Sequence, residues 1–383
     1  MLNCAPRLKS ERVSLFEAVG RILADDIHSD VNMPPSDLSA MDGYACRVQD
    51  STKEMIVIET IAAGAVPKKN VTPGTCSRIM TGAPVPKGAD TVIMFEDTVF
   101  NEQKGTISVV KTAKKSNIRY HAEDVGKGDK VLDKGTRIEA SHIAVLSSVG
   151  KATVRVAKMP VVGIIATGDE LVEPDKKPGK GKIRNSNSYQ LHAQIQSACA
   201  IPVYCGIAKD TPESLDAILK ASLPKCDVLL LSGGVSMGDF DYVPTVLKAN
   251  GIKLIFEKVA VKPGKPTVLG TTGKKCLFGL PGNPVSTFVL FEVLVKPFLS
   301  RMTGSHSLQP ILRLPLAQEI SRRKPDRQEF RPVSLTPDSK VVPVRYHGSA
   351  HIHAYTKADG IISIPRGQKS LNAGTVVEVQ LIR

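Results

Sequence analysis

Asp227-Val228-Leu229-Leu230-Leu231-Ser232-Gly233-Gly234-Val235-Ser236 is an apolar run that breaks into a loop of small residues. Two more apolar runs follow along the chain, over 252–261 and 275–280. The first leads into Lys262-Pro263-Gly264-Lys265-Pro266 and the second into Pro281-Gly282-Asn283-Pro284. The strands of a parallel α/β sheet end at one edge, and ligands bind at that edge. The three loops therefore predict one binding site at the carboxyl ends of the strands.

The residues before this stretch alternate between strand-like and helix-like patterns. Val161–Thr167 predicts a strand, and a helix over 188–200 and a strand over 202–207 follow. Thr211-Pro212-Glu213 has the pattern of an N-cap followed by proline at the first helical position, which predicts a further helix. We expect a central doubly wound α/β domain over residues 160–304.

The rest of the chain predicts smaller domains. Short apolar or alternating runs, separated by Gly, Pro and Asn turns, indicate an inserted β-rich domain over 46–136. Residues 1–45 and 137–159 are expected to form an N-terminal linker and dimerisation domain that contains an amphipathic helix over 15–23. Residues 305–383 predict a small C-terminal domain that resembles a β-barrel. The expected fold class is multidomain α/β and β.

Length and composition indicate an ordered protein of several domains. The chain has 383 residues, of which 42% are hydrophobic, and so exceeds one typical core. Its start lacks the apolar core of a signal peptide, and its longest apolar segment, 287–299, is interrupted by Glu292 and Lys296. The seven cysteines show no CxxC pair and no zinc-like spacing. We expect reduced thiols in a cytoplasmic protein and no membrane insertion.

The formal net charge is +14, and it is concentrated near the C-terminus. Residues 301–383 hold 13 Lys and Arg against 6 Asp and Glu, a net charge of +7. A basic domain can bind nucleic acid or an anionic small molecule. The chain has no Trp, and Phe330 is the single aromatic residue of the basic segment 322–331, so aromatic residues do not alternate with the basic ones as in single-strand binding. We expect an anionic ligand or a solubilising charge, and no nucleic acid.

Several carboxylates lie at the expected ends of strands or in loops, and these are Asp42, Asp124, Asp169, Glu170, Asp210, Asp239 and Asp241. Two ionised carboxylates at ~4 Å repel by about 4 kcal/mol at an effective dielectric constant near 20. Converging acids therefore take up protons or bind a hard cation, and Mg²⁺ suits oxygen ligands. A single loop carboxylate is more often a turn residue or a cap, which is the role we expect for Asp169 and Asp239.

The basic and small residues of the same loops favour phosphate binding. Lys258 and Lys262 are four apart, which places both on one side of an expected strand, although a solvated edge would give the same spacing. Gly233 and Gly234 would let backbone amides close around a phosphate, although a plain turn uses such residues too. Asn283 is expected to cap the following helix.

Six sequence motifs, in this order along the chain, resemble those of the MoeA family of molybdopterin molybdenumtransferases and of the related E-domain of gephyrin. The motifs are Ser39–Ala45 (SAMDGYA), Met80–Pro86 (MTGAPVP), Thr167–Leu171 (TGDEL), Ser232–Ser236 (SGGVS), Lys262–Pro266 (KPGKP) and Leu280–Pro284 (LPGNP). They occur in the family's order, and the resemblance covers the chain from about residue 12 to the C-terminus. Family members usually carry a helix before that point, so the resemblance suggests a short or truncated start.

The resemblance implies a role for each matching residue. It assigns Glu170, Asp210 and Asp241 to a Mg²⁺ and molybdate region, and it assigns Lys258 and Lys262 to phosphates. Residues matching Asp42, Thr81 and Asp124 complete the catalytic set from the facing subunit of a homodimer. The cofactor-binding residues implied are Ser232, Gly233, Gly234, Ser236, Lys265, Pro281, Gly282, Asn283 and Pro284.

The last domain holds two features of its own. Arg327-Gln328-Glu329-Phe330-Arg331 resembles a family element with the pattern Arg-x-Glu-Phe-x-Arg, but is one residue shorter. His351 and His353 are two apart, which suits one face of a strand, but surface histidines are the expected reading because no third metal ligand is evident.

The expected function is insertion of molybdate into adenylylated molybdopterin, with hydrolysis of the phosphoanhydride and release of AMP. The alternatives are a tungstate-inserting paralogue, a MogA-type molybdopterin adenylyltransferase and a non-enzymatic scaffold like gephyrin. The segments that flank the α/β domain argue against the second, and the lack of an appended MogA-like domain argues against the third. A MogA-type enzyme and molybdoenzyme maturation proteins are possible partners. No residue in the sequence distinguishes an enzyme that inserts molybdate from one that inserts tungstate.

Overall fold

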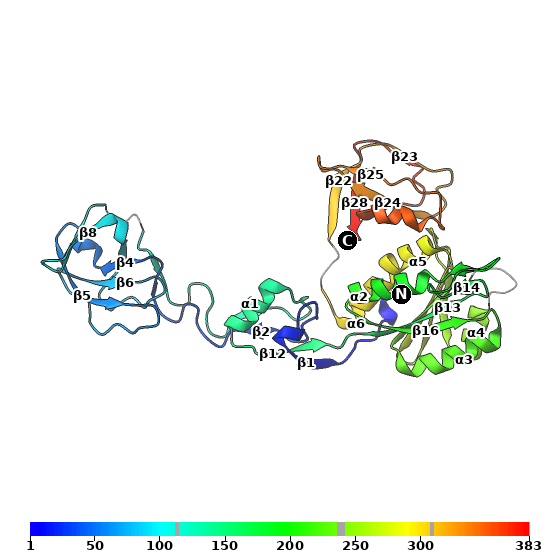
Figure 1. Cartoon of the computed structure of the whole chain (residues 1–383), viewed down its shortest axis with the longest axis horizontal. Coiled ribbons are helices and arrows are strands. Elements are labelled where there is room, and N and C mark those ends of the chain that lie inside the picture. The colour runs from blue at the N-terminus through cyan, green and yellow to red at the C-terminus, as the bar shows by residue number, and fades with distance from the viewer. Residues whose placement is uncertain (112–114, 236–241, 307–309, 383) are drawn as a thin grey trace. The chain divides into compact units, whose positions relative to one another are not determined.

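The computed structural model describes residues 1–111, 115–235, 242–306 and 310–382 (Figure 1). The chain forms two compact units. The first unit comprises Met1–Asp25, Gly135–Glu139 and Thr153–Arg383, and the second comprises Asp26–Lys134 and Ala140–Ala152.

A six-stranded sheet with the order β16-β13-β17-β21-β20-β18 is the centre of the first unit. Its strands are β13 (Val161–Thr167), β16 (Ile201–Ala208), β17 (Val228–Ser232), β18 (Lys253–Lys258), β20 (Pro266–Thr272) and β21 (Lys275–Leu280). β13, β16, β17 and β21 are parallel, and β20 is antiparallel to both of its neighbours, β21 and β18. Because β18 therefore runs in the same direction as β21, its end at Lys258 lies at the same edge as the ends of β17 and β21.

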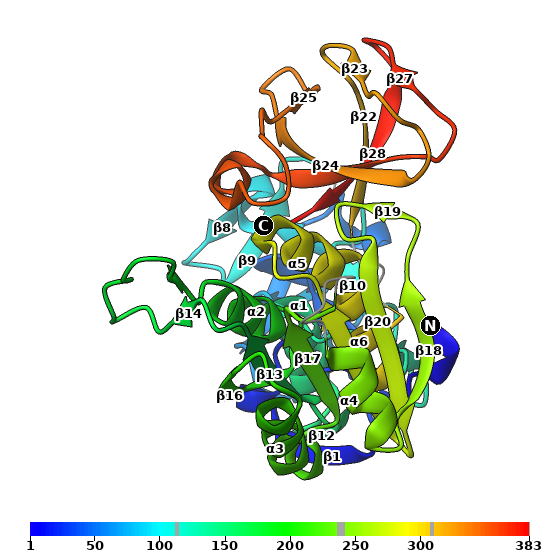
Figure 2. The ribbon, with the colours of Figure 1, turned by 90° about the vertical axis from the view of Figure 1, so that its right-hand side faces the viewer.

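Helices cover both faces of this sheet, as Figure 2 shows. One face packs against α2 (Asn187–Ser197), α5 (Pro284–Leu290) and α6 (Lys296–Thr303), with a π-helical turn, η6 (Phe291–Val295), between the last two. The other face packs against α3 (Pro212–Ser222) and α4 (Val243–Ala249). Buried apolar side chains alternate between the two faces along β17, so each face forms its own core. The predicted doubly wound α/β domain is confirmed.

A second six-stranded sheet, with the order β19-β24-β26-β28-β22, lies in the C-terminal part of the first unit, with β25 paired to β24 off this path. Its strands are β19 (Val261–Lys262), β22 (Ile311–Pro315), β24 (Gln328–Leu335), β25 (Val341–Pro343), β26 (Gly360–Ile364) and β28 (Val376–Leu381). A short pair, β23 (Ile320–Ser321) and β27 (Ser370–Leu371), and the 3-10 segment η7 (Ile352–Lys357) complete this part. Buried side chains of β24, β26 and β28 form its core. The resemblance to a β-barrel that was expected over 305–383 stays a prediction.

The N-terminal segment differs from its prediction. The helix expected over 15–23 is wrong, because the structure has a strand, β1 (Ser10–Ser14), followed by one 3-10 turn, η2 (Leu15–Glu17). β1 pairs antiparallel with β12 (Thr153–Ala157). Ser14 and Glu17 form a capping box at the start of this single turn. Before this strand lies a short 3-10 segment, η1 (Leu2–Cys4).

The second unit holds a six-stranded sheet with the order β7-β4-β6-β5-β9-β8. Its strands are β4 (Gly43–Cys46), β5 (Met55–Ile61), β6 (Thr75–Ile79), β7 (Thr91–Met94), β8 (Thr98–Asn101) and β9 (Thr106–Val109). The 3-10 segments are η3 (Val48–Asp50) and η4 (Phe95–Asp97), and the unit's helix is α1 (Ala140–Ser148). Two short pairs join β2 (Ile27–His28) to β11 (Lys130–Leu132) and β3 (Leu38–Ser39) to β10 (Ile118–Arg119).

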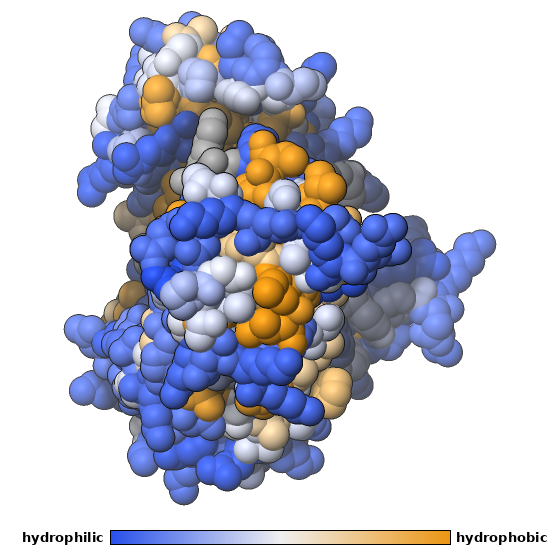
Figure 3. Space-filling view, turned by 90° about the vertical axis from the view of Figure 1, so that its left-hand side faces the viewer, coloured by the Kyte–Doolittle hydropathy of each residue, from blue (hydrophilic) through white to orange (hydrophobic). Residues whose placement is uncertain are grey.

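The surface in Figure 3 is largely hydrophilic, with hydrophobic residues in separate patches. Among the described residues, no helix is both long and apolar enough to cross a membrane.

Candidate active site

The loops after β13, β17 and β21 meet at the carboxyl edge of the α/β sheet. The backbone N–H of Gly233 donates to the carbonyl of Leu280 at 2.9 Å, which joins the ends of β17 and β21. Gly233 has a φ of +104°, and a Cβ built on it would lie 2.6 Å from both the carbonyl oxygen and the hydroxyl of Thr167. Only glycine fits this conformation and this close approach, so the glycine pair is part of the packing between strand ends as well as a turn.

Asn187, the first residue of α2, ties two of these loops together. Its Nδ2 atom donates to Ser232 Oγ and to the carbonyl of Gly282, each at 2.8 Å. Its Oδ1 atom is buried and has no hydrogen-bond partner among the described residues. The sequence prediction missed this residue, although it follows directly after the polar stretch 183–186 and begins a helix. The pairing with Ser232 needs the fold, because 45 residues separate the two positions.

Two predicted acids lie on neighbouring loops of this edge. The carboxylate of Asp210, just after β16, accepts the backbone N–H of Asp169 at 3.1 Å, and Asp169 in turn accepts the N–H of Asp210 at 3.4 Å. Asp169 thus bonds to the neighbouring loop and caps no helix there, since the N-cap of α3 is Thr211; Asp239, expected to be a cap as well, lies outside the described residues. Glu170 is exposed and its carboxylate lies over Gly168, where a Cβ would come within 2.5 Å of Glu170 Oε2. Gly168 therefore leaves the space that the Glu170 carboxylate occupies.

The third predicted metal ligand, Asp241, and the predicted binding residue Ser236 lie outside the described residues. In the part of the chain that the structure describes, no three His, Cys, Asp or Glu side chains are grouped as metal ligands. The prediction of a three-carboxylate metal site therefore stays a prediction.

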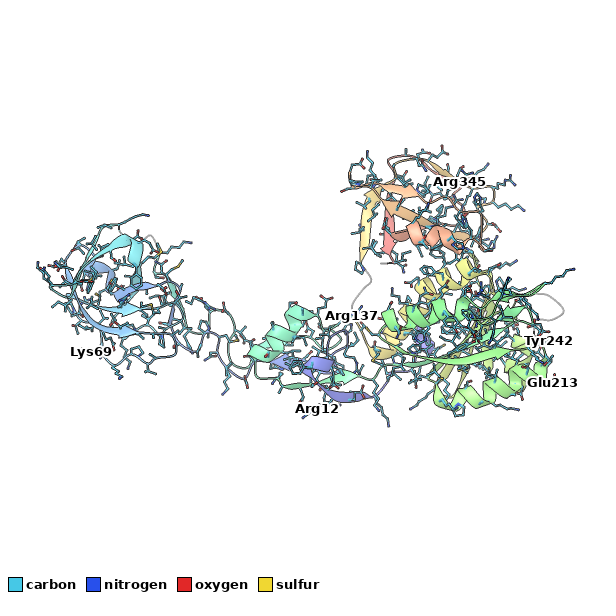
Figure 4. All side chains as sticks on the ribbon, viewed as in Figure 1. Arg12, Lys69, Arg137, Glu213, Tyr242 and Arg345 are labelled. Atoms are coloured by element: carbon cyan, nitrogen blue, oxygen red, sulfur yellow. The ribbon has the colours of Figure 1, made fainter. Side chains whose placement is uncertain are left out.

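A small pocket opens beside Asp210. Its walls come from the ends of β13, β16 and β17 and the starts of α3 and α4, and they include Thr167, Lys209, Asp210, Thr211, Gly234 and Tyr242. Figure 4 labels Tyr242, together with Glu213 of the first turn of α3, at this end of the sheet. Thr211 caps α3 by accepting the N–H of Ser214 at 3.2 Å, as its sequence pattern predicted. The pocket therefore places polar groups of three successive loops around one point.

The predicted lysines lie on two different strands, which corrects the single strand expected over 252–261. Lys258 ends β18 and pairs with Pro266 in the α/β sheet. Lys262 belongs to β19, which pairs with β24 of the C-terminal sheet, where Lys262 lies opposite Glu329. The N–H of Val259 donates to the carbonyl of Lys265 at 2.9 Å and closes the loop between them. The two lysines therefore do not share a strand face, and the argument from their spacing fails.

Glu329 is a buried carboxylate that contacts three basic side chains. Its side chain is 1% exposed, and its Oε1 atom lies 3.4 Å from Lys262 Nζ and 3.0 Å from Arg331 Nε. Its Oε2 atom lies 3.7 Å from Nη1 of Arg322, whose side chain is 2% exposed. The element Arg327–Arg331 thus supplies a buried anion that holds Lys262 at the junction between the two sheets of the first unit.

Comparisons with known proteins agree along the whole chain. Family models match three successive regions: the MoeA N-terminal region (domain I and II) at residues 1–150, a probable molybdopterin binding domain at 163–301, and the MoeA C-terminal region (domain IV) at 313–382. A Staphylococcus epidermidis protein named molybdopterin molybdenumtransferase is 36% identical, over 98% of this chain and 91% of its own length. A Bacillus subtilis protein of the same name is also 36% identical, over 98% and 90%. The chain belongs to the MoeA family.

A solved structure supports this assignment. The molybdopterin biosynthesis moeA protein of Pyrococcus horikoshii OT3 matches with a TM-score of 0.86 and 31% identity, over 99% of this chain and 97% of that chain. The family resemblance and the fold class predicted from the sequence are therefore confirmed.

In this MoeA-family chain the second unit brings two of its predicted residues together. The backbone N–H and the hydroxyl of Thr81 both donate to Asp42 Oδ1, at 2.6 and 2.8 Å. These two hydrogen bonds, the backbone one first, hold the pKa of Asp42 below its usual range. Asp124 is paired instead with Arg119, and its backbone N–H donates to the carbonyl of Met33 at 3.0 Å. The motifs SAMDGYA and MTGAPVP thus meet through Asp42 and Thr81.

The remaining predicted site residues shape the loop after β21. Asn283 occupies the N-cap position of α5, but its side chain makes no capping hydrogen bond, so that expectation is wrong. The carbonyl of Asn283 accepts the N–H of Thr287 instead, and the Thr287 hydroxyl donates to the carbonyl of Pro281 at 2.6 Å. The turn is held by its backbone, and the exposed Asn283 side chain is left to face solvent or a ligand.

Surface positions are expected for His351 and His353 of the C-terminal part. The rings of His347 and His351 stack with centroids 5.3 Å apart, and His351 Nδ1 accepts the N–H of His347. His351 precedes η7 and His353 lies within it, so the two do not lie on one strand.

Proposed function

We propose that this chain is a molybdopterin molybdenumtransferase that inserts molybdate into adenylylated molybdopterin and releases AMP. The observation that carries the proposal is similarity over nearly the full length, at 36–37% identity, to proteins that bear this name. A MogA-type adenylyltransferase is disfavoured because the MoeA regions on both sides of the α/β domain are present as well.

The carboxyl edge of the α/β sheet suits an anionic, phosphorylated ligand. The Ser232–Gly234 loop lies beside the first residue of helix α2, Asn187. The N–H of Gly233 is used in its bond to Leu280, so Gly234 is the glycine of the pair whose amide would approach a ligand. Such amides and helix starts attract phosphate oxygens. Lys258, Lys262 and Lys265 are all exposed on the neighbouring loop and would neutralise charge on the phosphates. In this role they orient the phosphoanhydride toward the acidic loops.

The acidic loops fit the Mg²⁺ that the family resemblance implies. Mg²⁺ is bound in proteins by one or two carboxylates, with waters and substrate phosphates completing its shell. Glu170 and Asp210 offer carboxylate oxygens from adjacent loops, and the Glu170 side chain is exposed. These two residues would hold the ion, with Asp241 as the third ligand. When bound, Mg²⁺ would neutralise the phosphates and the oxyanion. Tyr242 and Lys209 border the same pocket and would help to exclude bulk water from it.

The family resemblance also implies an oligomeric state, a location and partners. The protein is expected to work as a homodimer in the cytoplasm, with Asp42, Thr81 and Asp124 of one subunit completing the site of the other. A MogA-type enzyme would supply the adenylylated substrate, and maturation proteins of molybdoenzymes would take the product.

The proposal is tested by incubating purified protein with adenylylated molybdopterin, molybdate and Mg²⁺. AMP release that stops when molybdate or Mg²⁺ is omitted is the expected result. Binding of the pterin with no AMP release under any condition would support the scaffold alternative and overturn the proposal. The same assay with tungstate as competitor determines which oxyanion the enzyme prefers.

A further inference from the structure

Two cysteines outside the proposed active site meet above a glycine of the α/β sheet. Cys205 lies in β16 and Cys226 directly precedes the loop into β17, and the strand between them is β13. A Cβ built on Gly163 of β13 would lie 2.8 Å from Cys226 Sγ and 3.4 Å from Cys205 Sγ. The missing side chain of Gly163 thus leaves a space that both sulfur atoms border.

The pair lies at a pocket of about 220 Å³. The pocket is lined by Val203, Tyr204, Cys205, Ile218, Lys225 and Cys226, with Ala221 and Ser222 completing the wall. Cys205 is partly exposed, whereas Cys226 is 3% exposed. The pocket therefore gives access to the Cys205 thiol, and the Cys226 thiol lines the same pocket; the proposed reaction uses neither.

The backbone disfavours a disulfide between these thiols. Strands β16 and β17 are separated by β13, so their backbones are about 9–10 Å apart at the usual strand spacing. A disulfide needs Cα atoms closer than about 7 Å. The two sulfurs can approach each other only because both side chains lean over Gly163. A single cation bound over Gly163, where both sulfur atoms lie, does not need the close approach of the two Cα atoms that a disulfide requires.

We propose that Cys205 and Cys226 form a two-coordinate site for one thiophilic monovalent cation, Cu(I). Thiolates select soft cations of this kind. Binding replaces two S–H bonds by two S–Cu bonds and releases two protons, which leaves a bis-thiolate complex with one negative charge. The ammonium group of Lys225 at the pocket complements that charge. Zn²⁺ does not fit, because it needs four ligands and no third His, Cys, Asp or Glu joins the pair among the described residues.

A second cysteine pair provides the contrast. Cys46 and Cys76 lie in the same core of the second unit and both are 0% exposed. Burial raises the pKa of each thiol to about 12. No cation reaches these sulfurs in the folded protein, so a site at Cys205 and Cys226 predicts one bound ion per chain.

The test uses reduced full-length protein, titrated with Cu(I) without oxygen in the presence of a competing Cu(I) chelator. The expected result is one Cu(I) per chain, with two sulfur neighbours in X-ray absorption spectra. Cys205→Ser and Cys226→Ser should each lose the ion, while the control Cys199→Ser, which removes another partly exposed thiol, keeps it. Lys225→Gln should weaken binding by up to about fivefold, the size expected of an exposed charge interaction.

Retention of Cu(I) by the Cys205→Ser/Cys226→Ser double variant would overturn the proposal, and so would the absence of binding by the unaltered protein. Circular dichroism of each variant shows whether it is folded. If a variant is not folded, the proposal is tested by the coordination number of Cu(I) in the unaltered protein. Three or four neighbours of the ion would contradict a two-coordinate site. The readouts do not involve AMP release, so the outcome is independent of the proposed function.

Discussion

At the scale of single residues, Glu329 links the sequence to the site most directly. It is a buried anion in a domain with a net positive charge, and its three basic partners include Lys262, for which phosphate binding is proposed. Removing one partner of a buried ion pair leaves the other charge uncompensated, which typically costs about 3–5 kcal/mol. The Glu329 carboxylate therefore has two effects: it stabilises the C-terminal sheet, and it positions Lys262.

Glu329→Gln is expected to lower the stability of the first unit by about 3–5 kcal/mol, because Arg322 stays buried without its anion. The measurement is the urea midpoint of the folded chain. Glu378→Gln is the matched control, since the Arg313–Glu378 pair at 2.8 Å is exposed and is expected to contribute less than about 1 kcal/mol. Equal effects of the two variants would show that Glu329 has no special role.

Thr81→Val is expected to raise the pKa of Asp42 part of the way toward its usual range, because the hydroxyl donor is lost while the backbone donor remains. NMR titration of the Asp42 carboxyl group measures this. The pKa of Asp42 is lower in the folded chain, so the interaction stabilises the fold above the unfolded-state value of about 4 and is lost as the pH falls through the folded-state value. Thr81→Ser should leave the pKa unchanged, and a rise in that variant would contradict the assignment.

At the scale of elements, the start of α2 is as important to the site as the loops that the sequence motifs mark. Asn187 holds the loops after β17 and β21 in a fixed relation through two hydrogen bonds from one amide group. Each such bond contributes about 1 kcal/mol net, and its loss leaves a polar group without a partner.

Asn187→Ala is therefore expected to raise the Kd for adenylylated molybdopterin by about tenfold, which corresponds to ~1.4 kcal/mol. Isothermal titration with the folded variant measures the change. Asn185→Ala is a comparison at the same helix start, since Asn185 contacts Tyr204 and the N–H of Ser188 and neither strand-end loop. A larger effect on Kd from Asn185 than from Asn187 would show that helix capping matters more than the loop contacts.

The sequence predicted regular elements well where the pattern was local. Val161–Thr167 and Lys275–Leu280 were predicted to the residue, and Thr211 capped its helix as expected. The errors have a common cause, which is pairing between distant segments. The helix expected over 15–23 does not form, and Ser10–Ser14 just before it pairs with β12. The run 252–261 is divided because Val261, like Lys262, pairs with β24. The contacts of Asn187 and Glu329 depend on such pairings and have no local signal.

At the scale of the whole molecule, the proposed site depends on residues from both compact units, and the homodimer hypothesis assigns them to different subunits. This predicts complementation between two inactive variants, Glu170→Ala in the first unit and Asp42→Ala in the second. In a two-fold dimer, half of the dimers formed by co-expression contain both variants and each of these has one intact site, so about a quarter of the unaltered activity should return. Separately purified variants mixed without subunit exchange are the control. Activity that stays at the background of each variant would show that a single chain supplies all these residues to its own site.

The central claim is that the acids at the carboxyl edge of the α/β sheet carry out AMP release. Single-turnover AMP release by Glu170→Gln, measured with the Kd for adenylylated molybdopterin in the same samples, tests it most directly. The expected result is a loss of at least about 100-fold in the rate, equivalent to ~2.7 kcal/mol, with a Kd within about threefold of the unaltered protein. An unchanged rate in Glu170→Gln would contradict the account and place the chemistry elsewhere on the chain.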